Sequence, residues 1–144
     1  MSKTFFLKTS YETEAIGAQL AKSIQAPAVI FLEGQLGVGK TTLVRGFLRE
    51  FGVNSFVKSP TFTLVETYDV GEVQIVHADL YRLKDARELE ALGFRDYFTD
   101  NTICIIEWAS RAHELLPKPQ MVCTLEMSEA GDERRLVISE KVGV

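Results

Sequence analysis

Apolar positions in the first part of the chain recur at two periods, which predict alternating strands and helices. The segment AVIFLE is continuously apolar and rich in β-branched residues, which is typical of a buried strand. Two other segments repeat apolar or small residues every three to four positions, as amphipathic helices do. Thr9 or Ser10 can cap the first of these helices, and Pro27 follows its end. The predicted elements are strands over 4–8 and 28–33 and helices over 11–24 and 40–51.

Hairpins and one more helix are predicted in the rest of the chain. TFTLVETY alternates like a half-buried strand, and the short turn DVGE joins it to VQIVHADLY, so these two are expected to pair. TICIIEW predicts another buried strand, and the last two strands flank a turn and are expected to pair antiparallel. The predicted elements are strands over 61–68, 73–81, 102–108, 121–127 and 134–140, and a helix over 85–98.

A glycine-rich loop, GQLGVGKTT, stands between the buried strand and the second helix. Gly34, Gly39, Lys40 and Thr41 satisfy the pattern G-x-x-x-x-G-K-[ST] in its required strand-to-helix setting. Such a loop turns successive backbone N–H groups toward phosphate oxygens at the positive end of a helix. The lysine reaches the β- and γ-phosphates, and the threonine hydroxyl binds Mg²⁺. The sequence therefore predicts a Mg²⁺-dependent protein that binds ATP and ADP.

The order of the elements indicates the fold class. Helices alternate with apolar strands early, and hairpins follow, which favours an α/β fold. We expect a three-layer P-loop NTPase-like domain with a mixed, mostly parallel central sheet and terminal antiparallel strands. The 144 residues suit one domain over 1–144, because two domains of half that size would each be marginally stable. The pattern does not define the strand order.

Two acids at predicted strand ends are candidates to complete the magnesium site. Glu107 follows four apolar residues, and Asp79 follows VQIVHA in the same way. A P-loop protein needs a carboxylate at the end of a neighbouring strand. The alternative is a structural acid that caps a helix or pairs with an arginine such as Arg82. Spacing alone leaves open which acid contacts the metal.

Two further residues have a functional and a structural interpretation. His77 shares a strand face with Asp79, so it can orient that acid or contact a phosphate, although a partly buried histidine with satisfied hydrogen bonds is the commoner case. Thr61 follows the P-loop helix, where a threonine can sense the γ-phosphate as switch loops do. It can equally begin a strand after Pro60.

Trp108, Arg134 and Arg135 are also placed near the predicted site. Trp108 is the only tryptophan and follows Glu107, so it is either a core residue or a partner contact beside the nucleotide. Arg134 and Arg135 stand at the last turn, where an arginine can stack on a base or reach a phosphate. A solvated surface pair is the alternative.

Charge and apolar runs limit the partners. The net charge of −4 argues against strong binding of nucleic acid by this chain alone, so contact with tRNA is expected only through a partner. No apolar run approaches the roughly 20 residues of a membrane helix, and the start lacks a secretory signal. We expect a cytoplasmic protein without membrane contact. Cys104 and Cys123 lie in apolar runs, which predicts buried thiols in neighbouring strands.

The motifs GQLGVGKTT, VKSPTFTLVETY, HADLYRL, LEALGFRDYF and CIIEW occur here in one order and spacing. Together they resemble the TsaE (YjeE) family, and the resemblance runs from about Ser10 to Glu140. The P-loop is generic, whereas the SPTFTLVE and HADLYRL segments are much more specific to that family.

The resemblance implies an ATPase needed for N6-threonylcarbamoyladenosine (t6A) at position 37 of tRNAs that read codons beginning with A. Members of the family act with TsaB and TsaD, and TsaD transfers the threonylcarbamoyl group. The TsaE-type subunit binds the TsaB–TsaD heterodimer and hydrolyses ATP, which is thought to reset the complex. Hydrolysis by the subunit alone is expected to be weak.

Site residues follow from the resemblance by matching position. It implies that Thr41 and Glu107 hold magnesium and that Trp108 is tied to activity or to a partner. It also implies catalytic roles for Asp79, Thr61 and Lys40. The implied nucleotide-binding residues are Ser10, Thr13, Gly34, Leu36, Gly37, Val38, Gly39, Lys40, Thr41, Thr42 and Arg134.

A small-molecule kinase is the alternative function. It shares the P-loop, magnesium and strand-end acids, and Asp79 would then be the base for an acceptor hydroxyl. Arg82, Arg87 and Arg95 could form its lid, although 144 residues leave little room for a lid and an acceptor pocket together. ADP formation without any acceptor distinguishes the two.

Overall fold

A central β-sheet organises the protein in the computed structural model, which describes residues 2–35, 37–54, 60 and 63–140. Within these residues the sheet has seven strands in the order β1-β7-β6-β2-β5-β4-β3. The elements are β1 (Ser2–Leu7), α1 (Ser10–Ser23), β2 (Ala28–Glu33), α2 (Lys40–Glu50), β3 (Val65–Val70), β4 (Val73–Asp79), α3 (Arg87–Ala91), η1 (Phe94–Tyr97), β5 (Thr102–Glu107), η2 (Ala109–Leu115), β6 (Met121–Met127) and β7 (Arg134–Glu140).

The sheet is mixed, as predicted. Strands β6, β2, β5 and β4 form a parallel centre. Antiparallel pairs β1–β7, β6–β7 and β3–β4 flank it, which confirms both hairpins. In the parallel centre Leu32 and Asp79 both lie in register with Glu107. The carboxyl ends of β2, β4 and β5 therefore meet at one edge of the sheet, where ligands of α/β proteins bind.

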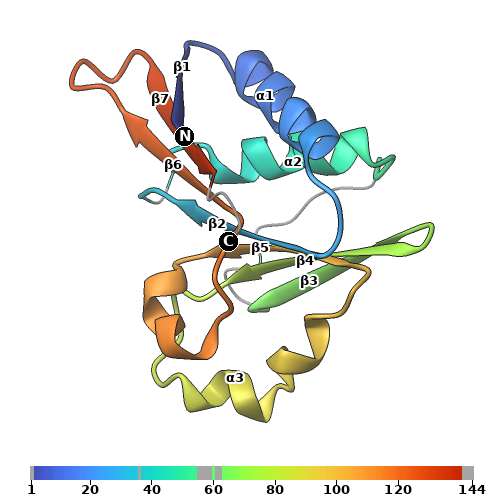
Figure 1. Ribbon diagram of the computed structural model, residues 1–144. Coiled ribbons are helices and arrows are strands. Elements are labelled where there is room, and N and C mark those ends of the chain that lie inside the picture. The colour runs from blue at the N-terminus through green and yellow to red at the C-terminus, as the bar shows by residue number, and fades with distance from the viewer. Residues whose placement is uncertain (1, 36, 55–59, 61–62, 141–144) are drawn as a thin grey trace.

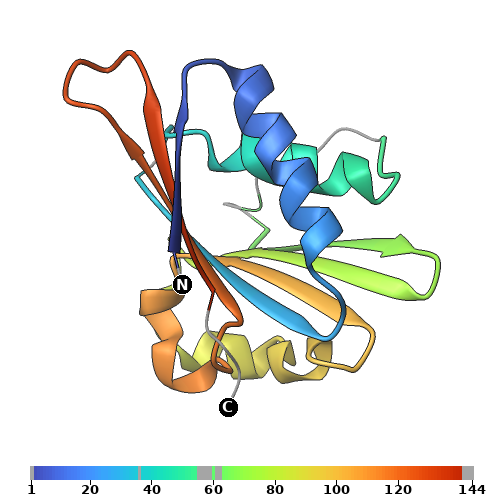
Figure 2. The ribbon, with the colours of Figure 1, turned by 45° about the horizontal axis from the view of Figure 1, so that its top comes forward.

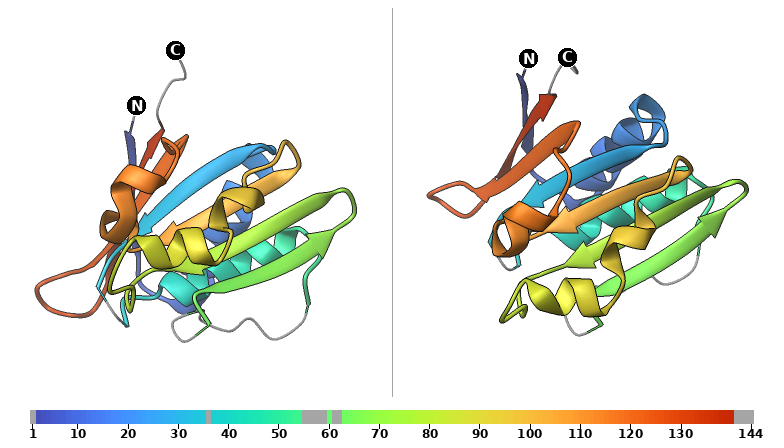
Figure 3. Two further views of the ribbon diagram at one scale, coloured as in Figure 1. Left: turned by 90° about the horizontal axis from the view of Figure 1, so that it is seen from below. Right: turned by 60° about the horizontal axis from the view of Figure 1, so that its bottom comes forward.

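Helical elements cover both faces of the sheet and give the predicted three layers. Helices α1 and α2 lie on one face, and α3 and the 3₁₀ helices η1 and η2 lie on the other (Figures 1 and 2). Side chains of β2 alternate between the two cores: Ile30 and Leu32 pack beneath α1 and α2, whereas Val29 and Phe31 pack on the other side. Figure 3 shows α3 and η2 lying across the opposite face from α1 and α2.

The close packing of α1 on α2 fixes the helix that follows the P-loop. Thr9 caps α1, because its hydroxyl accepts the backbone N–H of Glu12. A Cβ at Gly17 would lie 2.2 Å from the carbonyl oxygen of Leu43, so only glycine allows the two backbones to approach this closely. The position of α2, which begins at Lys40, is thus set by direct backbone contact with α1.

Two element predictions were wrong in extent. The helix expected over 85–98 is interrupted: α3 ends at Ala91, and Gly93 has a left-handed φ of 69° before η1. The strand expected over 61–68 begins only at Val65, because the Leu64 N–H donates to the carbonyl of Pro60 in a turn. Residues 61–62 lie outside the described part of the chain.

The cysteines are buried and free, as expected, but they are not on neighbouring strands. Cys104 lies on β5 and Cys123 on β6, and β2 separates these strands. Burial raises the pKa of each thiol to about 12.

Among the described residues, no helix combines the length and the apolar character that crossing a bilayer requires.

Candidate nucleotide-binding site

The glycine-rich loop joins the end of β2 to the first turn of α2. Gly34, Gly37 and Gly39 all have positive φ angles, of 151°, 78° and 110°. Gly39 is the N-cap of α2 and makes no side-chain capping bond. This backbone leaves the N–H groups of the first helical turn for an anion, which the helix dipole also favours. Leu36, predicted to bind nucleotide, lies outside the described residues.

Lys40 is held beneath this loop and is almost fully buried, with 6% of the residue exposed. Its Nζ donates a hydrogen bond of 2.6 Å to the carbonyl of Gly34 and lies 3.3 Å from Oε1 of Glu107. The same Nζ lies 4.8 Å from the centre of the Trp108 ring. Lys40 is therefore placed by three partners at the mouth of the phosphate loop.

Glu107 ends β5 and is the central carboxylate of the site. Its Oε2 accepts a 2.6 Å hydrogen bond from Nε2 of His77, and its Oε1 faces Lys40. Burial by itself raises the pKa of Glu107, but the hydrogen bond from His77 and the charge of Lys40 outweigh it and leave this pKa below its usual value. Glu107 is thus an ionised carboxylate inside the protein.

His77 contacts Glu107 and was predicted either to be a satisfied, partly buried histidine or to orient Asp79. It has no exposed surface, and Nε2 has its partner on β5 rather than within β4. Its Nδ1 makes no hydrogen bond within the described part of the chain. His77 is therefore more deeply buried than the partly buried residue that was predicted, and its hydrogen bonds are satisfied at Nε2 but not at Nδ1. Its partner depended on the strand order, which the sequence did not define.

Asp79 ends β4 directly beside Glu107. The two acids are register partners on parallel strands, so their side chains emerge on the same face of the sheet. Asp79 is 2% exposed, and its Oδ1 accepts the backbone N–H of Tyr81. That bond orients the carboxylate and closes the turn after β4. The structure thus brings Lys40, Glu107 and Asp79 to one edge of the sheet.

Trp108 follows Glu107 in a left-handed conformation with φ of 57°, which costs a residue with a side chain roughly 1–2 kcal/mol. The Trp108 ring packs against the Tyr81 ring, with 5.0 Å between their centres. The guanidinium of Arg111 lies over the same Tyr81 ring, 5.7 Å from its centre. Trp108 is half-buried and faces the loop, so it is neither a plain core residue nor a free surface one.

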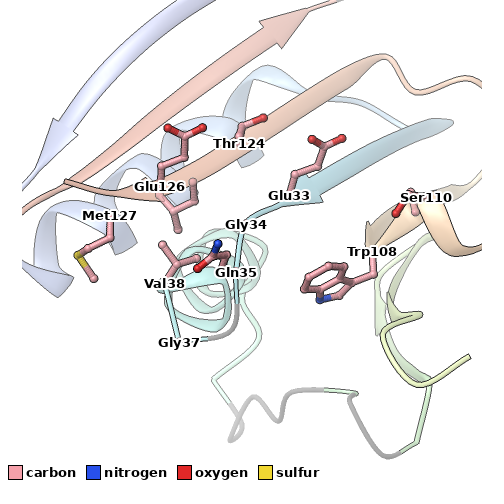
Figure 4. A pocket seen from close by; sticks show the side chains of 12 residues that line it. Glu33, Gly34, Gln35, Gly37, Val38, Trp108, Ser110, Thr124, Glu126 and Met127 are labelled. Carbon is pink, nitrogen blue, oxygen red and sulfur yellow. The ribbon is translucent and has the colours of Figure 1, made fainter. Parts of the chain in front are cut away.

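A cavity of about 760 Å³ opens between the P-loop, the end of β6 and the turn after β5. Figure 4 shows Trp108 on one side of the loop, Met127 on the other, and Glu33, Thr124 and Glu126 around it. The sequence did not predict the part of the cavity wall formed by Ser110, Thr124 and Glu126. It also did not predict that Tyr81 packs against Trp108. The only sequence signal for the β6 residues was their position near the carboxyl end of a predicted strand, and the pairing with β2 that brings them to the loop was not predicted.

Arg134 contacts the P-loop directly. Its Nε donates a 2.5 Å hydrogen bond to the carbonyl of Val38, and its side chain packs over Gly39. Arg135 instead forms an exposed ion pair with Glu126, as predicted for a solvated surface arginine. The two neighbouring arginines of β7 therefore have different surroundings.

The remaining predicted contacts are less direct. Thr41 and Thr42 are half-buried in the first turn of α2. Ser10 is the first residue of α1, and the hydroxyl of the buried Thr13 donates to the carbonyl of Thr9. Nucleotide contacts of Ser10 and Thr13 stay predictions. Thr61 lies outside the described residues, and its switch role also stays a prediction.

The oxygen ligands beside the P-loop suit a Mg²⁺ ion bound together with a nucleotide better than a metal ion held by protein side chains alone. Within the described residues, no group of three or more His, Cys, Asp or Glu side chains could hold a metal ion. Glu107, Asp79 and the Thr41 hydroxyl offer oxygen ligands beside a phosphate loop. Mg²⁺ usually takes one or two carboxylates and completes its shell with water and substrate phosphates. These residues therefore fit a magnesium ion that arrives with a nucleotide.

A glycine-rich loop with positive φ angles at the start of a helix, with a buried lysine and two strand-end acids next to it, is complementary to a phosphate chain and its cation. The chain is a P-loop nucleotide-binding protein by fold and by site. The sequence profile described as threonylcarbamoyl adenosine biosynthesis protein TsaE matches residues 7–137. The chain therefore belongs to the TsaE family, which confirms the resemblance seen in its motifs.

Individual relatives agree with this assignment. A Haemophilus influenzae protein named tRNA threonylcarbamoyladenosine biosynthesis protein TsaE is 42% identical over 115 residues, or 80% of this chain and 73% of that protein. A Bacillus subtilis protein of the same name is 38% identical over 132 residues, or 92% of this chain and 81% of the relative. The crystal structure of Bacillus subtilis YdiB superposes with a TM-score of 0.82 at 29% identity and covers 97% of this chain and 86% of that one.

Proposed function

We propose that this chain is the ATP-binding and ATP-hydrolysing subunit required for t6A modification at position 37 of tRNAs that read codons beginning with A. It acts with a TsaB–TsaD heterodimer in the cytoplasm, and it contacts tRNA only through that complex. The names of its relatives support the pathway, and the net charge of −4 favours indirect contact with tRNA. Residues 1–144 act as one ATPase domain in this proposal.

The observation that carries the enzymatic part is the convergence of Lys40, Glu107 and Asp79 beneath the P-loop. Lys40 neutralises charge on the β- and γ-phosphates once it leaves Glu107. Thr41 and Glu107 would hold Mg²⁺, which when bound offsets the charge that develops on the phosphate oxygens. Asp79 lies beside Glu107 and orients the attacking water, and Thr61 serves as the γ-phosphate sensor.

The cations at the described site support the proposal that a partner stimulates hydrolysis. The cations that the structure places at the loop are Lys40 and Arg134, and Arg134 is already bound to a loop carbonyl. Transition-state charge in phosphoryl transfer is commonly neutralised by an additional arginine, often supplied by a second protein. We therefore expect slow hydrolysis by the chain alone and faster hydrolysis with the heterodimer, with Trp108 close to the contact.

The test is steady-state ADP release by the wild type and by Asp79→Asn, each with and without a TsaB–TsaD heterodimer and without any acceptor. Asp79→Asn keeps the shape and removes the charge, so nucleotide binding should survive while stimulated hydrolysis falls by roughly a hundredfold. If the heterodimer leaves the wild-type rate unchanged and a sugar or nucleoside raises it, the protein is a small-molecule kinase instead.

A further inference from the structure

Within the described part of the chain, His77 is a fully buried titratable group near the site that has no role in the proposed reaction. It lies on β4, two residues before Asp79, and none of its surface is exposed. Its ring reaches across to β5, where Nε2 lies 2.6 Å from Oε2 of Glu107. Because Glu107 is paired with the ammonium of Lys40 and a carboxylate can only accept, the hydrogen of this bond belongs to Nε2.

This bond divides the two oxygens of Glu107 between different neighbours. Oε2 is bound to His77, so Oε1 is the oxygen that faces Lys40, at 3.3 Å. Lys40 in turn donates to the carbonyl of Gly34, so Oε1 is the oxygen paired with the side chain that contacts the phosphate loop. If Glu107 ligates magnesium, Lys40 and the metal need the same atom. Lys40 must then move to the phosphates as the cation arrives.

We propose that His77 is a positioning residue that holds Glu107 so that Oε1 is shared in turn by Lys40 and by magnesium. Without the His77 bond, the Glu107 carboxylate is free to turn both oxygens toward Lys40, because an unpaired carboxylate oxygen inside the protein is energetically unfavourable. A two-oxygen ion pair would hold Lys40 away from the phosphates and would compete with the metal. This inference rests on the magnesium site of the proposed function.

The test measures how strongly Mg²⁺ tightens ADP binding, so it needs neither hydrolysis nor partners. The fluorescence of Trp108, the only tryptophan, reports ADP titrations with excess Mg²⁺ and with a chelator. His77→Gln places an amide N–H about as far along the side chain as Nε2, whereas His77→Asn is too short to reach Glu107. The two variants differ by one methylene and bury the same polar group, so each controls for the other.

We expect the ratio of ADP affinity with and without Mg²⁺ to fall by roughly tenfold in His77→Asn, the scale of a lost charge-assisted hydrogen bond, and to stay within about twofold of wild type in His77→Gln. Affinity without Mg²⁺ should change little in His77→Gln. Val76→Ala removes a buried side chain of β4 on the opposite face and should leave the ratio unchanged. Thermal unfolding identifies variants that are folded at the assay temperature.

Two outcomes overturn the inference, and they are distinguishable. If Mg²⁺ increases the ADP affinity of the wild type and of both His77 variants by the same factor, the role of His77 is refuted while the magnesium site stands. If wild-type affinity for ADP is the same with Mg²⁺ and with chelator, the magnesium site of the proposed function fails, and the role of His77 fails with it.

Discussion

Lys40 and Glu107 form an ion pair inside the protein, with 3.3 Å between Nζ and Oε1 and with 6% and 4% of their side chains exposed. The pair joins the first residue of the P-loop helix to the end of the central strand β5. Removing one partner of a buried pair leaves the other charge without compensation, which typically costs about 3–5 kcal/mol. This pair therefore links the stability of the fold to the phosphate site.

Lys40→Ala should weaken both nucleotide binding and the fold. Losing a charge-assisted contact to phosphate costs roughly 1.5–3 kcal/mol, so ATP affinity measured by calorimetry should fall by about tenfold or more. The unpaired carboxylate of Glu107 should also lower the free energy of unfolding in urea. An affinity equal to that of the wild type would contradict the assignment of a working P-loop.

Thr41→Ala and Glu107→Ala test the metal ligands. Each variant should weaken Mg²⁺-dependent binding of ATP, because each removes one oxygen ligand from a shell that the phosphates complete. Binding measured with a chelator should be much less affected in Thr41→Ala, which keeps the Lys40–Glu107 pair. Normal magnesium dependence in Glu107→Ala would assign the metal to Asp79, its register partner on β4.

Lowering the pH should reduce the free energy of unfolding of the wild type over a defined pH range. The pKa of Glu107 is below its usual value in the folded protein, so the ionised form favours the native state. Its contribution is fully present above the unfolded pKa, near 4.3, and is lost as the pH falls through the lower folded value. We therefore expect the stability difference between wild type and Glu107→Gln to narrow below about pH 4.3. Urea unfolding of both at pH 7 and at acidic pH measures it; a constant difference would show that Glu107 does not titrate in this window.

The sequence predicted the parts of the site that are set by local patterns. The P-loop is a contiguous motif, and acids at the carboxyl ends of parallel strands share one edge of the sheet, although the strand order decides how close they lie. Lys40, Glu107 and Asp79 therefore come together as expected. In contrast, the His77–Glu107 bond depends on β4 lying next to β5 in one register, and no local pattern encodes that adjacency.

Other differences have the same origin in tertiary structure or in backbone geometry. The cavity wall from β6 requires that strand to pair with β2, and the separation of the cysteines follows from β2 lying between β5 and β6. The helix expected over 85–98 had suitable apolar spacing, but Gly93 adopts a left-handed conformation and divides it. A glycine inside a helical pattern can be tolerated or can end the helix, and spacing does not distinguish these cases.

Arg134 provides a test of how the P-loop is held in shape. Its Nε donates to the carbonyl of Val38, and its side chain covers Gly39, so β7 supports the loop just before α2 begins. A loop held in its binding geometry before the ligand arrives does not lose that ordering entropy on binding. Arg134→Ala should therefore weaken ADP binding by roughly tenfold, on the scale of a hydrogen bond from a charged donor. The loss should be similar with Mg²⁺ and with chelator, because Arg134 contacts the loop rather than the strand-end acids.

Arg135→Ala is the matched control for this prediction, since it removes the neighbouring arginine of β7, whose partner is the exposed Glu126. Surface ion pairs contribute about 0–1 kcal/mol, so its ADP affinity and its stability should stay close to those of the wild type. Arg134→Lys should recover little, because lysine carries a methylene group where arginine has the Nε that donates to Val38. Calorimetric titration of ADP into the three variants measures these differences in affinity. Equal affinities in Arg134→Ala and Arg135→Ala would show that the Val38 bond does not shape the site, and the nucleotide contact predicted for Arg134 would fail with it.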